Sequence, residues 1–207
     1  MKRGFATLAF VLACTGAPHA QDTSMSFFVT SVNPGKGGDL GGLAGADAYC
    51  GQLATAAGST GKTWKAYLST DAENAKDRIG NGPWYNAKGE KIADDVASLH
   101  GDKNNLTKQT ALSEKGDVIN GRGDTPNRHD ILTGTKADGT AAPETCGNWT
   151  MGGTDGAAIV GHSDRTGLNE SAEAKSWNSS HATRGGCTVD AFRGTGGEGL
   201  FYCFAAN

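Results

Sequence analysis

The chain has 207 residues, with 19 basic and 22 acidic side chains and a formal net charge of −3. This nearly balanced charge excludes the strongly basic surface of a typical nucleic-acid-binding protein, so no nucleic-acid partner is expected. The 32 glycines are about twice the usual share, and only 37% of the residues are hydrophobic, which predicts a loop-rich fold with a modest core. Such a fold needs covalent cross-links for its stability.

The first residues of the chain resemble an export signal. Lys2 and Arg3 precede an apolar run, and small residues follow as far as Ala20. We therefore predict a signal peptide at residues 1–20 and a single domain at residues 21–207, in a secreted or periplasmic protein. No later apolar run is long enough for a membrane span.

A second interpretation of the N-terminal segment is that of an outer-membrane lipoprotein. The residues Val11-Leu12-Ala13-Cys14 form an imperfect lipobox, which would place a lipid anchor on Cys14. Under either interpretation, Cys14 does not contribute to a disulfide within the domain.

The domain is predicted to begin with a strand, a helix and a second strand. Residues 26–32 are β-branched and aromatic and end at a turn signal. Apolar residues then recur at helical spacing over residues 43–57, which places Cys50 on the buried face of a helix that Gly58 ends. Residues 63–69 alternate with period two and are predicted as the second strand.

Polar, turn-rich sequence occupies most of the chain after this opening. Residues 70–145 hold only scattered apolar anchors, with one small helix predicted at residues 74–79. Within this stretch, Trp84 and Tyr85 follow a Gly-Pro turn and are the better candidates for exposed aromatic side chains. Because ordinary connections are short, a stretch of this length needs tethering or a binding role.

The last residues of the chain are predicted to form a central strand. Alternation over residues 199–205 places Phe201 and Cys203 on one face and Tyr202 and Phe204 on the other. Both faces therefore carry side chains that favour burial, and the rest of the domain must pack around this strand.

Four cysteines lie within the predicted domain, and they permit three disulfide connectivities. If the last strand pairs beside the first and the helix packs on that sheet, Cys50 lies near Cys203. Cys146 then pairs with Cys187. The layout thus favours two nested bridges, although the sequence alone does not choose between the three arrangements.

Four blocks of the sequence stand out, in this order: Gly41-Gly42-Leu43-Ala44-Gly45-Ala46-Asp47-Ala48-Tyr49-Cys50, Thr63-Trp64-Lys65-Ala66-Tyr67-Leu68-Ser69, Cys146-Gly147-Asn148-Trp149-Thr150 and Leu200-Phe201-Tyr202-Cys203-Phe204. These blocks resemble the endostatin branch of the C-type lectin-like fold. More closely, the chain resembles a bacterial exported family, much of it described as lectin or as of unknown function. The resemblance covers about residues 26–207 and implies an α+β domain with a mixed, mostly antiparallel sheet, paired N- and C-terminal strands, one main helix, long loops and the two nested disulfides.

The metal-binding motifs of those relatives do not carry over. Sugar-binding C-type lectins hold calcium partly through a Trp-Asn-Asp triplet, whereas this chain has Trp177-Asn178-Ser179, and the zinc-binding histidines of endostatin have no counterpart. Oxygen-bearing side chains nevertheless crowd the polar segment before Cys187. A calcium ion, if one is bound, is expected at Asp164, Glu170 and Asn178.

The resemblance and the loop chemistry together predict a binding protein whose ligand is a carbohydrate. Carboxylates and amides can bond sugar hydroxyls, and an aromatic face can stack on a sugar ring. The alternative is an extracellular protein partner, bound without sugar or metal. The candidate ligand-binding residues are Asp155, Asp164, Asn169, Glu170, Trp177 and Asn178.

The sequence does not indicate catalysis. His100, His129, His162 and His181 are scattered through polar segments, without the close spacing that is typical of a metal site. No serine lies in a nucleophile elbow. We therefore predict that the protein is not an enzyme.

Overall fold

The computed structural model describes Met1 and residues 24–207, and its main sheet is built around the C-terminal strand β8 (Gly197–Ala205). Strand β1 (Phe27–Val29) pairs with β8 in antiparallel register, with Phe28 opposite Cys203. The predicted pairing of the first and last strands is therefore confirmed. The predicted signal peptide and Cys14 lie outside the described residues.

Three further strands extend the sheet beyond β8. The path runs β1-β8-β5-β6-β7, and β5 beside β8 is the one parallel pair along it. A short strand, β2, pairs antiparallel with the C-terminal part of β8. These strands are β2 (Trp64–Ala66), β5 (Asp130–Leu132), β6 (Ile159–His162) and β7 (His181–Ala182).

Two hydrophobic clusters cover the two faces of β8. Phe201 and Cys203 belong to the cluster beneath the main helix, whereas Tyr202 and Phe204 belong to the cluster on the opposite face. All four side chains are buried. The alternation predicted for the last strand is thus confirmed, and it explains why β8 lies at the centre of the domain.

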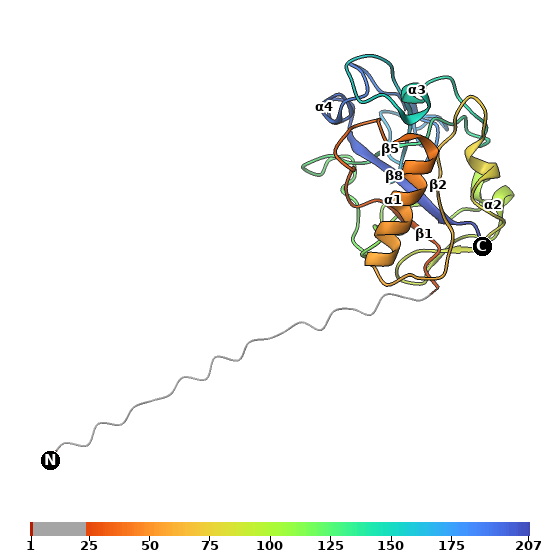
Figure 1. Ribbon diagram of the computed structural model, residues 1–207, viewed down its shortest axis with the longest axis vertical. Coiled ribbons are helices and arrows are strands. Elements are labelled where there is room, and N and C mark those ends of the chain that lie inside the picture. The colour runs from red at the N-terminus through yellow and green to blue at the C-terminus, as the bar shows by residue number, and fades with distance from the viewer. Residues whose placement is uncertain (2–23) are drawn as a thin grey trace.

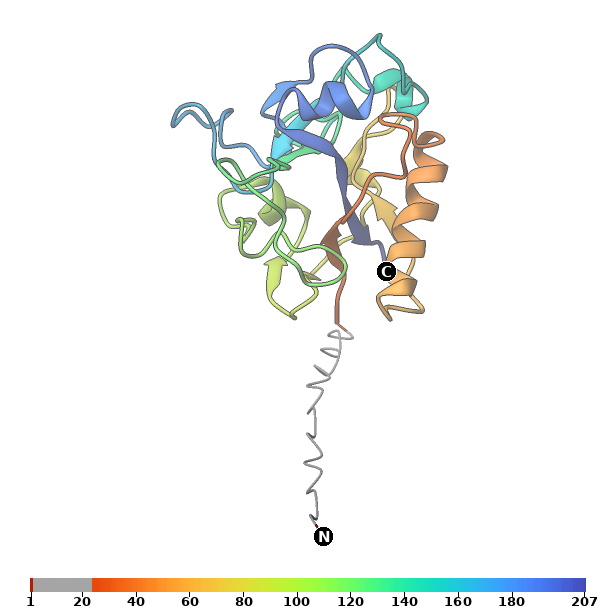
Figure 2. The same ribbon diagram turned by 90° about the vertical axis from the view of Figure 1, so that its left-hand side faces the viewer.

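The main helix α1 (Gly42–Ala56) packs on one face of this sheet, and Ala46, Cys50 and Ala54 form its buried stripe. Figures 1 and 2 show α1 running alongside β8, with the segments between β2 and β5 gathered on the other side of that strand. Gly58 ends the helix with a φ of +86° and donates its N–H to Thr55 O. The predicted helix and its glycine terminus are confirmed.

The two disulfides are those that the sequence analysis favoured. Cys50–Cys203 joins α1 to β8, and Cys146–Cys187 closes a loop inside it, with sequence separations of 153 and 41 residues. Structural disulfides of this kind are typical of oxidising compartments. None of the described helices combines the length and the hydrophobicity that crossing a bilayer requires.

The segment between β2 and β5 is more ordered than its composition suggested. Most of its buried apolar residues belong to the hydrophobic cluster on the face of β8 opposite α1. A single 3₁₀ turn replaces the predicted helix at residues 74–79. Trp84 is fully buried and its indole N–H donates to Ala205 O at 3.2 Å, so the prediction of an exposed aromatic was wrong for Trp84. The elements are η1 (Ala75–Asp77), β3 (Trp84–Tyr85), β4 (Lys91–Ala93) and α2 (Val96–His100).

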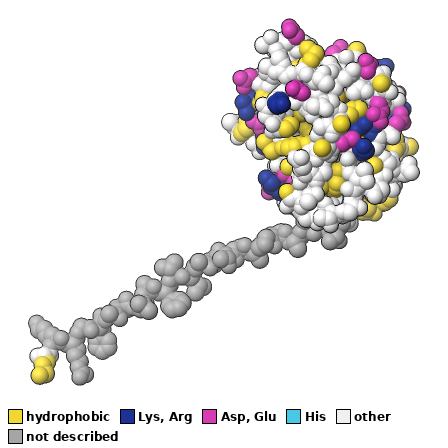
Figure 3. All heavy atoms as spheres, in the orientation of Figure 1, with side chains coloured by type: hydrophobic (Ala, Val, Ile, Leu, Met, Phe, Trp, Pro, Cys, Tyr) yellow, Lys and Arg dark blue, Asp and Glu magenta, His cyan; other side chains and the backbone are white. Residues whose placement is uncertain are grey.

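Two more short helical segments flank the second disulfide. In α3 (Cys146–Trp149) all four residues have positive φ, which makes a tight left-handed turn, and α4 (Val189–Arg193) leads into β8. Figure 3 shows acidic and basic side chains interspersed on one face of the domain, with no extended area of either sign. This mixed surface agrees with the nearly balanced charge of the sequence.

Candidate metal site

Three neighbouring strands bring four ionisable side chains to one place. His129 directly precedes β5, Asp130 begins that strand, His162 ends β6 and His181 begins β7. Asp130 and His162 are partners in the antiparallel β5–β6 register. The arrangement is therefore set by strand pairing, which fixes side-chain positions more firmly than loops do.

Two glycines leave the space that this convergence needs. Next to His162, Gly161 lies against a neighbouring chain segment, and a Cβ there would be 1.9 Å from Trp177 O. Gly196, with a φ of +117°, lies behind the cluster, where a Cβ would be 3.4 Å from both Asp130 Oδ1 and His129 Nε2. A larger residue would collide with the Trp177 backbone at position 161 and would be strained by the positive φ at position 196.

The Nε2 atoms of the three histidines surround the Asp130 carboxylate. His129 Nε2 and His162 Nε2 lie 3.2 and 3.3 Å from Oδ1, and His181 Nε2 lies 3.5 Å from Oδ2. The Nε2 atoms of His162 and His181 are 3.1 Å apart. The rings of His129 and His162 stack with centroids 4.3 Å apart and planes inclined by 9°.

The Asp130 carboxylate is buried among these nitrogens. Asp130 is only 2% exposed, and apart from the three imidazoles neither of its oxygens has a hydrogen-bond partner among the described residues. The nitrogens bond the carboxylate only where Nε2 carries a proton, and such bonds from His162 and His181 lower the pKa of Asp130. A buried carboxylate without such bonds is costly, and native proteins retain one mainly where it pairs with a charge or binds a metal.

The other ring nitrogen of each histidine faces an acceptor oxygen. His129 Nδ1 lies 2.9 Å from Asp164 Oδ1, His162 Nδ1 lies 2.7 Å from Ala174 O, and His181 Nδ1 lies 3.1 Å from Ala182 O. Because carbonyl and carboxylate oxygens only accept, these contacts favour a proton on each Nδ1. In neutral rings of this tautomer the Nε2 lone pairs are directed inward, as in metal-binding histidines whose Nδ1–H is held by an outer acceptor, and the 3.1 Å contact between His162 Nε2 and His181 Nε2 then needs a shared proton or ion.

The charges of the cluster are coupled. Burial alone would raise the pKa of Asp130, but the adjacent His162 and His181 outweigh it, so the pKa of this carboxyl lies below its ordinary value. The pKa of Asp164 is also lowered, because bonds from His129 and from the Arg122 backbone N–H outweigh its burial. The Asp130 side chain in turn raises the pKa of the half-buried His181.

The spacing of the ligand atoms fits a tetrahedral metal ion. Zinc binds imidazole nitrogen and carboxylate oxygen at about 2.0–2.1 Å, so the edges of such a tetrahedron are about 3.3 Å long. Four of the six edges have distances of 3.1–3.5 Å, which bracket that value, with Oδ1 of Asp130 nearest His129 and His162 and Oδ2 nearest His181. Among the described residues, His129, Asp130 and His162 are the single group of three His, Cys, Asp or Glu side chains close enough to share an ion, and His181 adjoins it.

No family model matches this chain, and no curated protein matches it either. Its function therefore has to be argued from the site itself.

A pocket of about 550 Å³ opens onto this cluster. His129, His162 and His181 line it, whereas the Asp130 side chain lies behind them and is 1% exposed. An ion held by the four side chains would therefore have one side directed toward the pocket. Solutes that enter the pocket could reach it.

The predicted ligand-binding residues divide between this pocket and other locations. The Asp164 side chain is 3% exposed and accepts a bond from His129, and Asn169 lines the pocket. Glu170 is exposed and pairs with Lys175, and Asp155 is exposed. Trp177 is buried within the hydrophobic cluster on the face of β8 opposite α1, where its ring is not available to a sugar.

The three residues expected to bind calcium make contacts of their own. Asn178 is 1% exposed and donates to Tyr67 Oη at 3.0 Å, while its Oδ1 accepts from Ser176 Oγ. Asp164 bonds His129, and Glu170 pairs with Lys175. These contacts give no support to a shared calcium site, which stays a prediction.

The cluster of three histidines and Asp130 was not predicted from the sequence, because its histidines lack the short spacing that is typical of many metal sites. Each ligand instead lies at the end of a short strand that pairs with its neighbour. The available signal was an ionisable residue at the boundary of an apolar run, in His129-Asp130-Ile131-Leu132 and in Ile159-Val160-Gly161-His162. Such a signal becomes informative only once the strand order is known.

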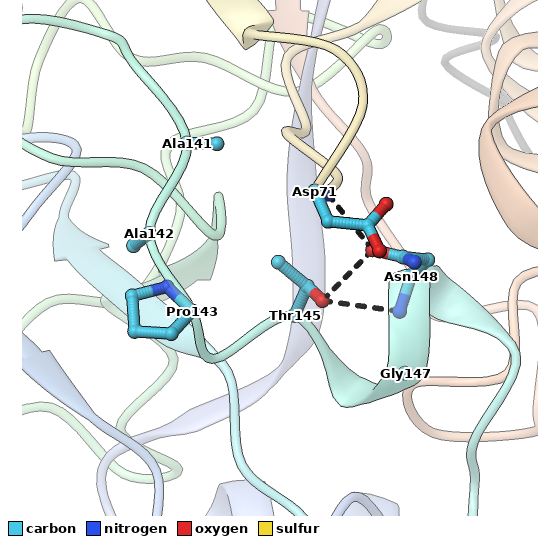
Figure 4. Close-up of a pocket in the computed structure, with 7 residues that line it drawn as sticks. All are labelled: Asp71, Ala141, Ala142, Pro143, Thr145, Gly147 and Asn148. Atoms are coloured by element: carbon cyan, nitrogen blue, oxygen red, sulfur yellow. Dashed lines mark hydrogen bonds between the residues drawn. The ribbon is translucent and has the colours of Figure 1, made fainter.

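A second pocket, of about 460 Å³, lies beside α3 (Figure 4). Its polar groups bond one another: Asn148 Oδ1 accepts from the Asp71 N–H at 3.1 Å, and Thr145 Oγ1 accepts from the Asn148 N–H at 3.0 Å. Asp71 is the single charged side chain that lines it. This pocket therefore offers less for ligand chemistry than the one above the histidines.

Proposed function

We propose that this protein binds one divalent transition-metal ion, zinc, through His129, Asp130, His162 and His181. One observation supports the proposal above all. A buried carboxylate has three imidazole nitrogens around it, at distances close to the edge lengths of a tetrahedral site. The outer bonds at each Nδ1 give the nitrogens the tautomer that binds metal.

The donor set favours zinc over the hard cations. Calcium and magnesium prefer six or more oxygen ligands, whereas imidazole nitrogen suits zinc, copper, nickel and iron. Among these, zinc is the one that proteins bind most often with four ligands in tetrahedral geometry. The two disulfides are consistent with an oxidising compartment. In such a compartment the protein would not compete with cytosolic thiols for zinc.

A purely electrostatic role for the cluster is the main competing explanation. A protonated His181 would pair with Asp130, in agreement with the raised pKa of that histidine. Such a pair accounts for one of the three nitrogens. It gives no reason for His129 and His162 to direct Nε2 at the same carboxylate, whereas a shared ion explains all three.

Carbohydrate recognition in the same pocket is a second candidate function. Polar side chains from the segment expected to bind sugar, among them Asn169 and Ser171, line the pocket beside the histidines. A sugar bound there would be sensitive to removal of the metal. A glycan array probed with and without chelator tests this. Sugar binding that is equal in both conditions would show that it does not depend on the metal site. That the protein is not an enzyme also stays a prediction.

Metal binding can be tested by calorimetry on untagged, disulfide-bonded protein freed of metal by chelator. We expect one equivalent of Zn²⁺ per chain, and Co²⁺ should give the visible absorption of a tetrahedral site. His162→Gln should weaken zinc binding at least about 100-fold, since it removes a ligand. His100→Gln is the matched control, because His100 bonds Tyr67 and Val96 instead of the cluster.

The proposal fails if the wild-type protein takes up no zinc, or if His162→Gln binds it as the wild type does. A circular dichroism spectrum and a thiol assay on each variant verify that the fold and both disulfides are intact. Loss of zinc binding in a folded His162→Gln variant can then be assigned to the missing ligand.

A further inference from the structure

Two arginine side chains line the pocket above the proposed metal site, in addition to the three histidines. Arg122 and Arg184 both line it, from the loop before β5 and from the segment after β7. Glu173 is the one acidic residue among the lining residues. The positive charges thus come from two separate chain segments, one before β5 and one after β7.

These two arginines form no ion pair within the described residues, whereas three other arginines do. Arg78 pairs with Asp47, and Arg128 and Arg193 pair with Glu198. Neither Arg122 nor Arg184 forms a salt bridge with any residue that the structure describes, and both side chains are exposed. An exposed guanidinium is suited to a bidentate contact with carboxylate or phosphate oxygens.

Arg184 lines the same pocket as His129, His162 and His181, so its guanidinium shares the space that the ligand nitrogens face. A divalent ion at the cluster would add to this positive field on the pocket side, because Asp130 lies behind the histidines.

We propose that the metal-loaded pocket binds a small oxyanion, with one oxygen on the ion and others on Arg122 and Arg184. This inference rests on the proposed zinc site. Zinc sites sometimes expand to five ligands, and a fifth ligand here would bind on the side of the ion that faces the pocket. The chemistry shared by free phosphate and by the carboxylate of an acidic sugar fits this arrangement, and a volume of about 550 Å³ accommodates either.

The test is calorimetric titration of the zinc-loaded protein with inorganic phosphate, acetate or glucuronate, in three separate arms. We expect saturable binding of phosphate or glucuronate, and at least tenfold weaker binding after zinc is removed. The double variant Arg122→Gln/Arg184→Gln should also lose at least tenfold in anion affinity while it keeps its zinc. Arg193→Gln is the matched control, since its side chain lies outside the pocket and pairs with Asp190 and Glu198.

The arms distinguish the sources of the oxyanion and the two proposals. Preference for phosphate identifies a phosphoryl ligand, and preference for glucuronate over acetate identifies an acidic sugar. Zinc binding without any anion binding overturns the oxyanion inference and leaves the zinc site standing. Anion binding that is equal in zinc-loaded and zinc-free protein also overturns it, as does double-variant protein that binds anions like the wild type.

Discussion

Asp130 and His162 are register partners across the β5–β6 pair, and their side chains meet with Oδ1 3.3 Å from Nε2. This relationship makes the candidate metal site part of the sheet. The backbone hydrogen bonds that align the two strands also hold the two ligands, so the site does not need to be assembled by a metal. A preformed site of this kind should bind its ion without a large rearrangement of the fold.

Asp130→Asn should separate metal binding from folding. Asparagine has nearly the shape of aspartate but removes the buried charge, so we expect the metal-free variant to unfold within about 1 kcal/mol of the wild type. At a free zinc concentration of one hundred times its dissociation constant, the wild type should gain about 2.7 kcal/mol and the variant almost nothing. Urea unfolding with and without zinc measures both quantities.

The opposite outcome for this variant would be informative. If metal-free Asp130→Asn lost about 3 kcal/mol or more, the carboxylate would act chiefly as the partner of charged histidines, because removing one member of a buried ion pair has a cost of that size. The metal proposal would then lose its main support.

Asp164→Asn should weaken zinc binding about 10- to 100-fold, although Asp164 is not a ligand in the proposed site. Its Oδ1 accepts the His129 Nδ1–H at 2.9 Å and so fixes the ring that directs Nε2 at the ion. Asp155→Asn is the control, because Asp155 is exposed and has no such contact with the cluster. Equal zinc affinities for the two variants would show that the Asp164 contact does not orient His129.

The pH dependence of metal-free and zinc-loaded protein should have opposite signs. The pKa of His181 is raised by Asp130, so in metal-free protein its contribution to stability is complete below the unfolded pKa and is lost as the pH rises through the folded pKa. Zinc competes with that proton, so zinc affinity should increase over the same pH range. The groups that face His181 are Asp130, His162 and Arg184.

Thermal unfolding and zinc titrations across pH 5–9, about two units either side of neutrality, measure both trends. His181→Gln should flatten the decline in metal-free stability toward high pH. If this variant kept the wild-type slope, the titrating group would be another histidine. The lowered pKa of Asp130 adds a separate loss of stability at acid pH, below the ordinary range for a carboxyl, and His181→Gln should reduce that loss because His181 is one of the groups that lower this pKa.

The framework of the fold could be predicted from the sequence because its signals are local. The alternation around Phe201 and Tyr202, the helical spacing around Cys50 and the glycine after it each occur within a few residues. Once the last strand is placed beside the first, two of the cysteines lie near each other. Burial of both faces of one strand therefore determined most of the architecture.

The site could not be predicted in the same way, because its signals are distant. His162 and His181 are separated by 19 residues and His129 and Asp164 by 35, across segments without apolar periodicity. Strands β5, β6 and β7 have only two to four residues each, too few for a recognisable alternation. Polar residues such as Thr133, buried and bonded to Asn178 O, also make the segment around β5 resemble a loop.

The two disulfides should contribute unequally to stability. Removing a bridge restores chain entropy to the unfolded state in proportion to the logarithm of the loop it closes, so the separations of 153 and 41 residues predict losses of about 5 and about 4 kcal/mol. We expect the paired substitution of Cys50 and Cys203 by alanine to lower the urea midpoint more than that of Cys146 and Cys187. A larger loss from the Cys146–Cys187 pair would instead mean that the left-handed turn of α3 depends on its bridge, since Cys146 is the first residue of that turn. Zinc titration of both paired variants then shows whether the strands that hold the histidines keep their register without each bridge.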